Sequence, residues 1–202
     1  MTKVFSALAV SVDGYISGCD PRDEEGGFGR GLGDAGMLFD WYFDGETDST
    51  VFSGFHLSEP SARYFDEVAG RVGVAVAGRE TYEHSSRFGG GSPHPTAPLV
   101  VVSHHPIPEI GERQTNVTSG IGDAIATARE LAGEKDVALM GGGVVTSALR
   151  AGLVDELILH QVPVLLGGGR RFFGELPAHV DLRLRQVVPA PGVTHLHYEV
   201  VR

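Results

Sequence analysis

Cysteine is nearly absent from this sequence: Cys19 is the only one, so no disulfide can form within the chain. Disulfides are typical of oxidising compartments, and their absence favours a protein of the reducing cytoplasm. The sequence also lacks an apolar run long enough to cross a bilayer, and its first residues lack the layout of a signal peptide. We therefore expect a cytoplasmic protein with no membrane partner.

Positive charge is scarce as well. The 16 Lys and Arg residues stand against 26 Asp and Glu residues, which leaves a net charge of −10. A protein that binds nucleic acid needs a basic face, so this balance argues against such a partner. A small anionic ligand remains compatible, because local N–H groups and a few Arg or His side chains outweigh net charge at short range. We expect a small-molecule ligand.

The order of apolar runs predicts the fold class. The 202 residues, of which 42% are hydrophobic, can build the core of one domain, and no linker divides residues 1–202. Strands are expected at residues 4–12, 72–77, 99–102, 137–140 and 156–166, and helices at 37–43, 59–69, 121–131 and 144–151. Strands separated by helices indicate an α/β fold with a mainly parallel central sheet and helices on both faces. The stretches 182–188 and 195–201 predict a closing antiparallel hairpin.

Two further segments carry structural expectations. Residues 18–36 are rich in glycine and charge, which cannot pack into a core, so we expect a mobile flap beside the first strand. His195 and His197 alternate along the last predicted strand, which favours an exposed strand face.

Three consecutive glycines form the most informative local pattern. Gly141, Gly142 and Gly143 follow a predicted buried strand, and Val144 and Val145 open the helix after them. Glycines let backbone N–H groups approach a ligand closely, and the positive end of a helix favours an anion. The pattern predicts a phosphate cradle; a tight turn between strand and helix is the alternative.

Two other strand ends carry polar groups of the same kind. Gly78, Arg79 and Thr81 follow one predicted strand, and Ser103-His104-His105 follows another. Because ligands of parallel sheets bind at the carboxyl ends of strands, we expect the three sites to hold one dinucleotide with an extra phosphate. A capped helix start is the alternative for the first site. The two histidines lack a third ligand at a suitable spacing, so no metal is expected.

The glycine-rich stretch departs from the common nucleotide motifs. The glycines are not followed by Lys-Ser or Lys-Thr, which argues against a P-loop for nucleoside triphosphates. The G-x-G-x-x-G order and its downstream acidic residue are also missing, which argues against an ordinary Rossmann dinucleotide site.

Several motifs in order resemble a known family. They are Ser11-Val-Asp-Gly-Tyr-Ile16, Gly78-Arg-Glu-Thr-Tyr-Glu83, Val100-Val-Val-Ser-His104, Met140-Gly-Gly-Gly-Val144, and Gly152-Leu-Val-Asp-Glu-Leu157 running into Pro163-Val-Leu-Leu-Gly-Gly-Gly169. Together they cover almost the whole chain and resemble the dihydrofolate reductase superfamily. The branch is that of the reductase half of the bifunctional deaminase-reductase of riboflavin biosynthesis.

This resemblance implies an NADPH-dependent reductase acting on a pterin or aminopyrimidine, such as the phosphoribosylamino-uracil of riboflavin biosynthesis. Dihydrofolate reductase and a non-catalytic nucleotide-binding protein are the alternatives. By position, Arg79 and Thr81 would contact the cofactor phosphates, and Ser103 with His104 or His105 the adenosine end. Gly141–Val145 would hold the pyrophosphate, while Gly14 and Ile16 would line the nicotinamide.

The substrate is expected between the first strand, the predicted helix with Trp41, and His160. In true dihydrofolate reductases a carboxylic acid near the pterin ring handles the proton. Asp40 is the nearest equivalent here, and Asp13 and Asp44 are competing candidates. The apolar strand at 156–166 and its glycine-rich tail also favour a homodimer.

Overall fold

The structure is a computed structural model, which describes residues 2–19 and 32–202. Most of the flap expected at residues 18–36 lies outside the described residues. Within these two ranges no helix is both long enough and apolar enough to cross a membrane.

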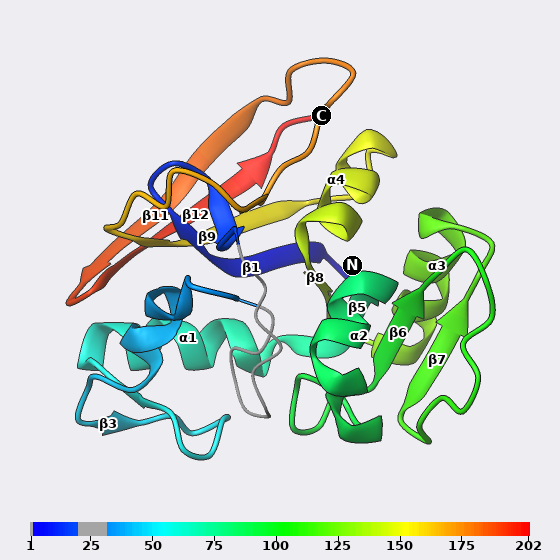
Figure 1. Ribbon diagram of the computed structural model, residues 1–202, viewed down its shortest axis with the longest axis horizontal. Helices are drawn as coiled ribbons and strands as arrows, with labels where there is room; N and C mark the ends of the chain where they lie inside the picture. Colours follow the sequence, from blue (N-terminus) through cyan, green and yellow to red (C-terminus); the bar gives the residue numbers. More distant parts are fainter. Residues whose placement is uncertain (1, 20–31) are drawn as a thin grey trace.

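An eight-stranded sheet forms the centre of the molecule, in the order β11-β12-β9-β1-β8-β5-β6-β7 (Figure 1). All pairings from β9 to β7 are parallel, whereas β12 runs antiparallel to both β9 and β11. This arrangement confirms the predicted α/β fold with its closing hairpin. The strands are β1 (Val4–Ser11), β5 (Val72–Gly78), β6 (Leu99–Val102), β7 (Gln114–Val117), β8 (Asp136–Met140), β9 (Glu156–Val162), β11 (Leu182–Ala190) and β12 (Val193–Val200).

Shorter elements and helices complete the chain. Two small antiparallel pairs join β2 (Tyr15–Ser17) to β10 (Arg170–Arg171) and β3 (Thr47–Asp48) to β4 (His56–Leu57). The helices are η1 (Gly36–Tyr42), α1 (Glu59–Gly70), α2 (Arg79–His84), η2 (Ser86–Gly90), α3 (Ile121–Ala132) and α4 (Gly142–Arg150).

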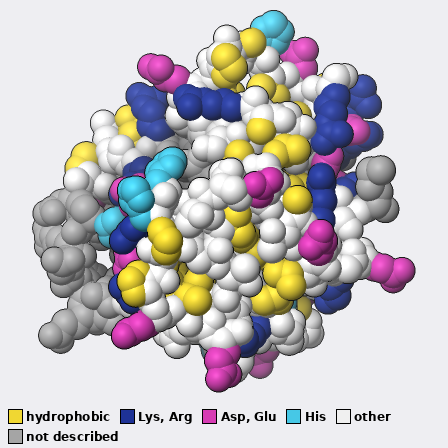
Figure 2. Space-filling model, turned by 90° about the vertical axis from the view of Figure 1, so that its right-hand side faces the viewer, with side chains coloured by type: hydrophobic (Ala, Val, Ile, Leu, Met, Phe, Trp, Pro, Cys, Tyr) yellow, Lys and Arg dark blue, Asp and Glu magenta, His cyan; other side chains and the backbone are white. Residues whose placement is uncertain are grey.

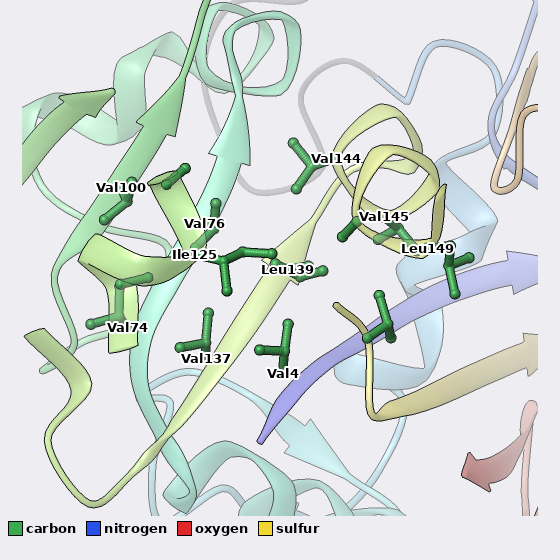
Figure 3. Close-up of a cluster of buried hydrophobic side chains, with 14 of the residues drawn as sticks. Val4, Val74, Val76, Val100, Ile125, Val137, Leu139, Val144, Val145 and Leu149 are labelled. Carbon is green, nitrogen blue, oxygen red and sulfur yellow. The ribbon is translucent and has the colours of Figure 1, made fainter. Parts of the chain in front are cut away.

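The central strands are apolar on both faces because helices cover both. On β5, Val74 and Val76 point to one face while Ala75 and Ala77 point to the other, and all four are buried. The first face packs against α3 and α4, as the valines around Ile125, Val145 and Leu149 show in Figure 3. The opposite face packs against η1, α1 and α2. The predicted covering of both faces is therefore confirmed.

Differences from the expected elements have local causes. The edge strand β7 was not expected, because Gln114, Thr115 and Asn116 are polar. Pro163 follows the last residue of β9, which is shorter than expected, since proline cannot donate to the ladder. The hairpin turns at Pro191–Gly192, where Gly192 has φ +74°.

A charged cluster ties together the amino ends of three strands. Arg71 donates to Asp136 at 2.8 Å and to Glu156 at 2.7 Å, and Lys3 also bonds Glu156. Burial by itself would raise the pKa of Glu156, but hydrogen bonds from His197, Lys3 and Arg71 outweigh it and lower the pKa. The cluster therefore holds β5, β8 and β9 in register at the end opposite their carboxyl termini.

We expect Arg71→Ala to lower the free energy of unfolding by about 2 to 3 kcal/mol, because it leaves Asp136 and Glu156 without their shared cation in a largely buried place. Urea unfolding monitored by circular dichroism measures the change. The matched control is Arg63→Ala, which removes an exposed ion pair with Glu59 and should cost less than about 0.5 kcal/mol. Equal losses in the two variants would contradict a stabilising role for the cluster.

Candidate functional site

A cavity of about 960 Å³ lies along the carboxyl ends of β5, β6 and β8 and continues between β1 and α1. Because these strands are parallel, their carboxyl ends meet at one edge of the sheet. The cavity has two parts of different chemistry. We call the part at the strand ends the polar half and the part beside α1 the aromatic half.

The glycine turn before α4 forms the floor of the polar half. Gly141 has φ +89°, and a Cβ atom there would lie 2.2 Å from Thr81 Oγ1. At Gly142 a Cβ atom would lie 2.5 Å from the carbonyl oxygen of Phe172. Among the described residues no side chain caps α4, so its first N–H groups remain available to an anion. The packing therefore requires glycine and leaves a backbone cradle that suits a phosphate.

Charged side chains surround this cradle. Arg79 begins α2 and is half-exposed, at 3.8 Å from Glu83. Arg170 of β10 lies 2.7 Å from Glu80, so this ion pair links β10 to α2. Both guanidinium groups line the cavity beside Thr81 and can reach a bound anion.

The end of β6 supplies the third group of the polar half. The Ser103 hydroxyl donates to the carbonyl of His105 at 2.6 Å and accepts from Asn116 Nδ2 at 2.8 Å. It thereby holds the turn that carries the exposed His104 and His105 side chains. Figure 2 shows a group of histidine side chains with Lys or Arg beside them on the face it presents. Gly120 and Ile121, where α3 begins, also line this half.

The aromatic half is built from η1, the β3–β4 connection and α1. Its rings pack edge to face or stacked, as with Phe52 on Phe55 at 5.1 Å and Tyr42 on Phe65 at 5.5 Å between centroids. These rings are Phe39, Tyr42, Phe52, Phe55 and Phe65. Such a surface suits a flat apolar or heteroaromatic ring.

A series of hydrogen-bonded, buried side chains reaches the aromatic half from the sheet. His160 of β9 lines the cavity, and its Nδ1 lies 2.8 Å from His195 Nδ1 on the paired strand β12. His195 Nε2 in turn lies 2.9 Å from the Ser61 hydroxyl on α1. Trp41 packs against both imidazoles, at 5.0 Å and 5.1 Å between ring centroids.

The two imidazoles are neutral at ordinary pH. Burial, together with the neighbouring imidazole, holds the pKa of His160 well below its usual value, and burial lowers the pKa of His195 to about 4. One shared hydrogen between the two Nδ1 atoms satisfies the contact. Either ring can carry this hydrogen, depending on the tautomer of each histidine.

The structure brings most of the sequence-predicted site residues to this cavity. Those that line it are Ile16, Gly78, Arg79, Thr81, Ser103, His104, His105, Gly141, Gly142, Gly143, Val144 and His160. The three strand-end sites expected to converge therefore do so.

Asp13 and Gly14, expected at the site, do not line the cavity. The Asp13 carboxylate accepts from the Ser11 hydroxyl at 2.5 Å and from the backbone N–H groups of Leu166 and Gly167. The bond from Ser11, aided by those N–H groups, lowers the pKa of Asp13 to about 2. Gly14 has φ +87°, and its carbonyl accepts from the Phe172 N–H at 2.9 Å. The structure gives both residues a part in fixing the turn after β1.

Asp40, Trp41 and Val145 also do not line the cavity. Asp40 is exposed on η1, because the buried side of that short helix is taken by Leu38, Trp41 and Tyr42. Trp41 is buried behind the imidazole pair, and Val145 packs in the core. The described part of the aromatic half therefore has no carboxylate, and the residues expected to handle a proton lie elsewhere.

Sequence reasoning missed the partners of His160. Alternation along β12 predicted an exposed face for His195, but the side chain is fully buried because α1 covers that face of the hairpin. Ser61 gave no signal beyond its place in an amphipathic helix. The pairing of β9 with β12, which places His195 opposite His160, is a tertiary contact.

The order of the parallel strands, the closing hairpin and the glycine turn at a strand end define a protein of the dihydrofolate reductase fold. The chain belongs to the RibD C-terminal domain family, which it matches over residues 2–196. The resemblance deduced from the sequence motifs is therefore confirmed.

The similarities to individual proteins are consistent with membership of this family. The chain is 26% identical over 198 residues to YwjB of Bacillus subtilis, a protein without an assigned function, covering 97% of each chain. A crystal structure of a protein from Shewanella sp. PV-4, provisionally assigned to riboflavin biosynthesis, is 26% identical and fits with a TM-score of 0.69 over 100% of both chains.

Two more distant structures share the fold. Dihydrofolate reductase from Enterococcus faecalis, in complex with NADP(H) and RAB-propyl, is 15% identical with a TM-score of 0.60 over 99% of this chain and 97% of that one. RibD of Acinetobacter baumannii is 16% identical with a TM-score of 0.56, and the chain spans 58% of its length.

The imidazole pair predicts a pH dependence of stability. Histidines of the unfolded chain titrate near pH 6.5. Below that pH the unfolded chain therefore binds protons that the buried pair does not bind, because the pKa values of the pair are lower. We expect the free energy of unfolding to fall as pH drops from about 6.5 to about 5, and the double variant His160→Phe/His195→Phe to lose roughly 1 to 3 kcal/mol less over this window.

Urea unfolding at a series of pH values measures this difference. His94 also has a pKa lowered by burial, but it contributes equally to both proteins. The control is His179→Phe, at an exposed position, which should leave the dependence of the unfolding free energy on pH unchanged. Parallel pH profiles for the parent and the double variant would disprove the neutral state of the pair.

Proposed function

We propose that the protein is an NADPH-dependent reductase that transfers a hydride to a small planar heterocycle. The observation that carries the proposal is one cavity with a glycine turn and cations in its polar half and an aromatic half beside it. A dinucleotide with several phosphates matches the first half, and a flat ring matches the second. NADPH supplies the hydride when bound.

The residues of the polar half support this cofactor. Gly141–Gly143 and the start of α4 would hold the pyrophosphate, because the turn needs glycine and these residues line the cavity. Arg79 and Thr81 would contact the phosphates. Ser103, through the turn it braces, would place His104 and His105 at the adenosine end. Ile16, which also lines the cavity, would lie against the nicotinamide.

The residues of the aromatic half would orient the substrate and exclude water. The family suggests the phosphoribosylamino-uracil of riboflavin biosynthesis as the first substrate to assay, with dihydrofolate as the alternative. Dihydrofolate is the less well supported of the two, since the described part of the aromatic half has no carboxylate. We keep a cytoplasmic location as part of the proposal, because NADPH is an intracellular cofactor.

The proposal predicts that NADPH binding depends on the space above Gly143. A Cβ atom at this position meets no protein atom within 4 Å, so the fold tolerates it. Because Gly143 lines the cavity, we expect the added methyl group to intrude on the cradle. We expect Gly143→Ala to raise the Kd for NADPH about ten-fold or more, roughly 1.4 kcal/mol, with a Tm that does not fall. Titration calorimetry measures the Kd.

The matched control is Gly122→Ala, since Gly122 is likewise the second residue of a helix with open space around it but does not line the cavity. It should leave the Kd unchanged. NADPH oxidation is then followed with each candidate substrate. Binding without oxidation of any candidate would favour the non-catalytic alternative, and absence of NADPH binding by the parent would overturn the proposal.

We also propose that the protein forms a homodimer through β11. This strand lies at the edge of the sheet, and Leu182, Leu184 and Val187 on it are 42%, 52% and 46% exposed. Leu182 and Leu184 stand beside Val200 and Tyr198, so the apolar surface continues onto β12. A second copy fits this edge, because two identical edge strands can pair antiparallel about a two-fold axis.

The dimer predicts a change of mass in one variant. Leu184→Glu would place a charge in the contact and should shift the protein to a monomer, with at least a ten-fold weaker dimer Kd. Sedimentation velocity measures the mass. Leu165→Glu, at a leucine 71% exposed outside β11, should leave the dimer intact. A monomeric parent protein would refute the dimer.

A further inference from the structure

The aromatic half lacks ionic groups among its described residues. The charged lining residues Arg79, Glu80 and Arg170 belong to α2 and β10, in the polar half. The aromatic half is instead lined by side chains of η1, α1 and β1 that are apolar or aromatic. A phosphate or carboxylate placed there would lose its hydration without gaining a cation from the described residues, which is strongly unfavourable.

His94 lines the cavity but does not change this conclusion. Its Nε2 lies 3.2 Å from the carbonyl oxygen of Ala69, and its Nδ1 accepts from the Ala97 N–H at 3.0 Å. The first contact needs a hydrogen on Nε2 and the second a bare Nδ1, so both ring nitrogens are in use and the ring is neutral.

His160 is different, because its partner occupies one ring nitrogen alone. Nδ1 faces His195, which leaves Nε2 as the ring nitrogen that can meet a ligand from the cavity that His160 lines. The side chain is 1% exposed, so this nitrogen is a polar atom within an apolar surface. A ligand with one hydrogen-bonding heteroatom would satisfy it.

His195 and Ser61 decide whether that nitrogen donates or accepts. If His195 donates its Nδ1 hydrogen, His160 carries its own hydrogen on Nε2, and the Ser61 hydroxyl donates to His195 Nε2. If His160 donates instead, its Nε2 is a bare acceptor and His195 Nε2 donates to Ser61. Both arrangements keep the two rings neutral, so the chain of hydrogen bonds suits a carbonyl oxygen as well as a ring N–H.

We propose that the substrate of this site is an uncharged, planar, conjugated ring compound without phosphate or carboxylate, bound through a hydrogen bond to His160 Nε2 that His195 and Ser61 orient. The inference rests on the proposed function, since it specifies the substrate class of the same cavity. It departs from the phosphorylated uracil that the family suggests. His160 contacts the substrate, while His195 and Ser61 are positioning residues.

Trp41 provides a direct measure of binding. It is the only tryptophan of the chain and packs against both imidazoles, so a ring bound beside His160 should quench its fluorescence. Three probes of one shape separate the interactions: fluorenone, which has a carbonyl, fluorene, which lacks it, and fluorenone carboxylate, which adds a charge. We expect fluorenone to bind about ten-fold more tightly than either of the others.

Variants then distinguish the effect of a lost hydrogen bond on probe binding from the effect of a changed pocket shape. His160→Phe should bring the Kd values of fluorenone and fluorene close together and leave fluorene binding unchanged, whereas His160→Gln should keep part of the preference. His195→Phe and Ser61→Ala should each reduce the preference by a smaller factor. A purely structural role would weaken both probes alike, and that result would overturn the proposal.

Two further outcomes distinguish this inference from the proposed function. Equal binding of fluorenone carboxylate and fluorenone, or faster NADPH oxidation with the phosphorylated uracil than with its dephosphorylated form, would overturn the substrate class while leaving the reductase intact. Failure to bind or oxidise NADPH, with the preference for fluorenone retained, would overturn the reductase and support the pocket described for His160.

Discussion

The parallel pairing from β9 to β7 is the constraint on which the rest of the structure depends. Parallel strands place all their carboxyl ends at one edge, and the connections after β5 and β8 lead directly into α2 and α4 there. Backbone N–H groups therefore gather at this edge without a partner in the sheet, which is the physical origin of the polar half. At the opposite edge, Arg71 joins Asp136 and Glu156, so the same strands are held in register by charge.

The cavity combines two chemical environments, one for each of the two proposed ligands. At the strand ends, glycine backbone and guanidinium groups favour anions, and beside α1 the packed rings favour a flat apolar surface. The first environment suits the charged cofactor, and the second suits an uncharged planar substrate. The buried chain from Ser61 through His195 to His160 brings hydrogen-bonding capacity into the apolar part without bringing charge, because burial keeps both imidazoles neutral.

Membership of the RibD C-terminal domain family and likeness to dihydrofolate reductases establish the fold, whereas a fold by itself does not determine the substrate. Asp40 illustrates the difference. Its sequence position next to Trp41 suggested a proton donor, yet η1 turns it to solvent and gives the inner side to Leu38, Trp41 and Tyr42. The substrate must therefore be deduced from the rings and imidazoles that remain.

The sequence by itself determined the alternation of strands and helices, the glycine turn, and the polar residues at three strand ends, because each is a local pattern of hydrophobicity or backbone freedom. It also determined the family, through motifs in order along the chain. Only the tertiary structure decided which of these residues share a cavity, since Asp13 bonds Leu166 and Gly167 and His195 meets His160 across two strands. Such contacts join residues far apart in sequence, and periodicity within a single element carries no information about them.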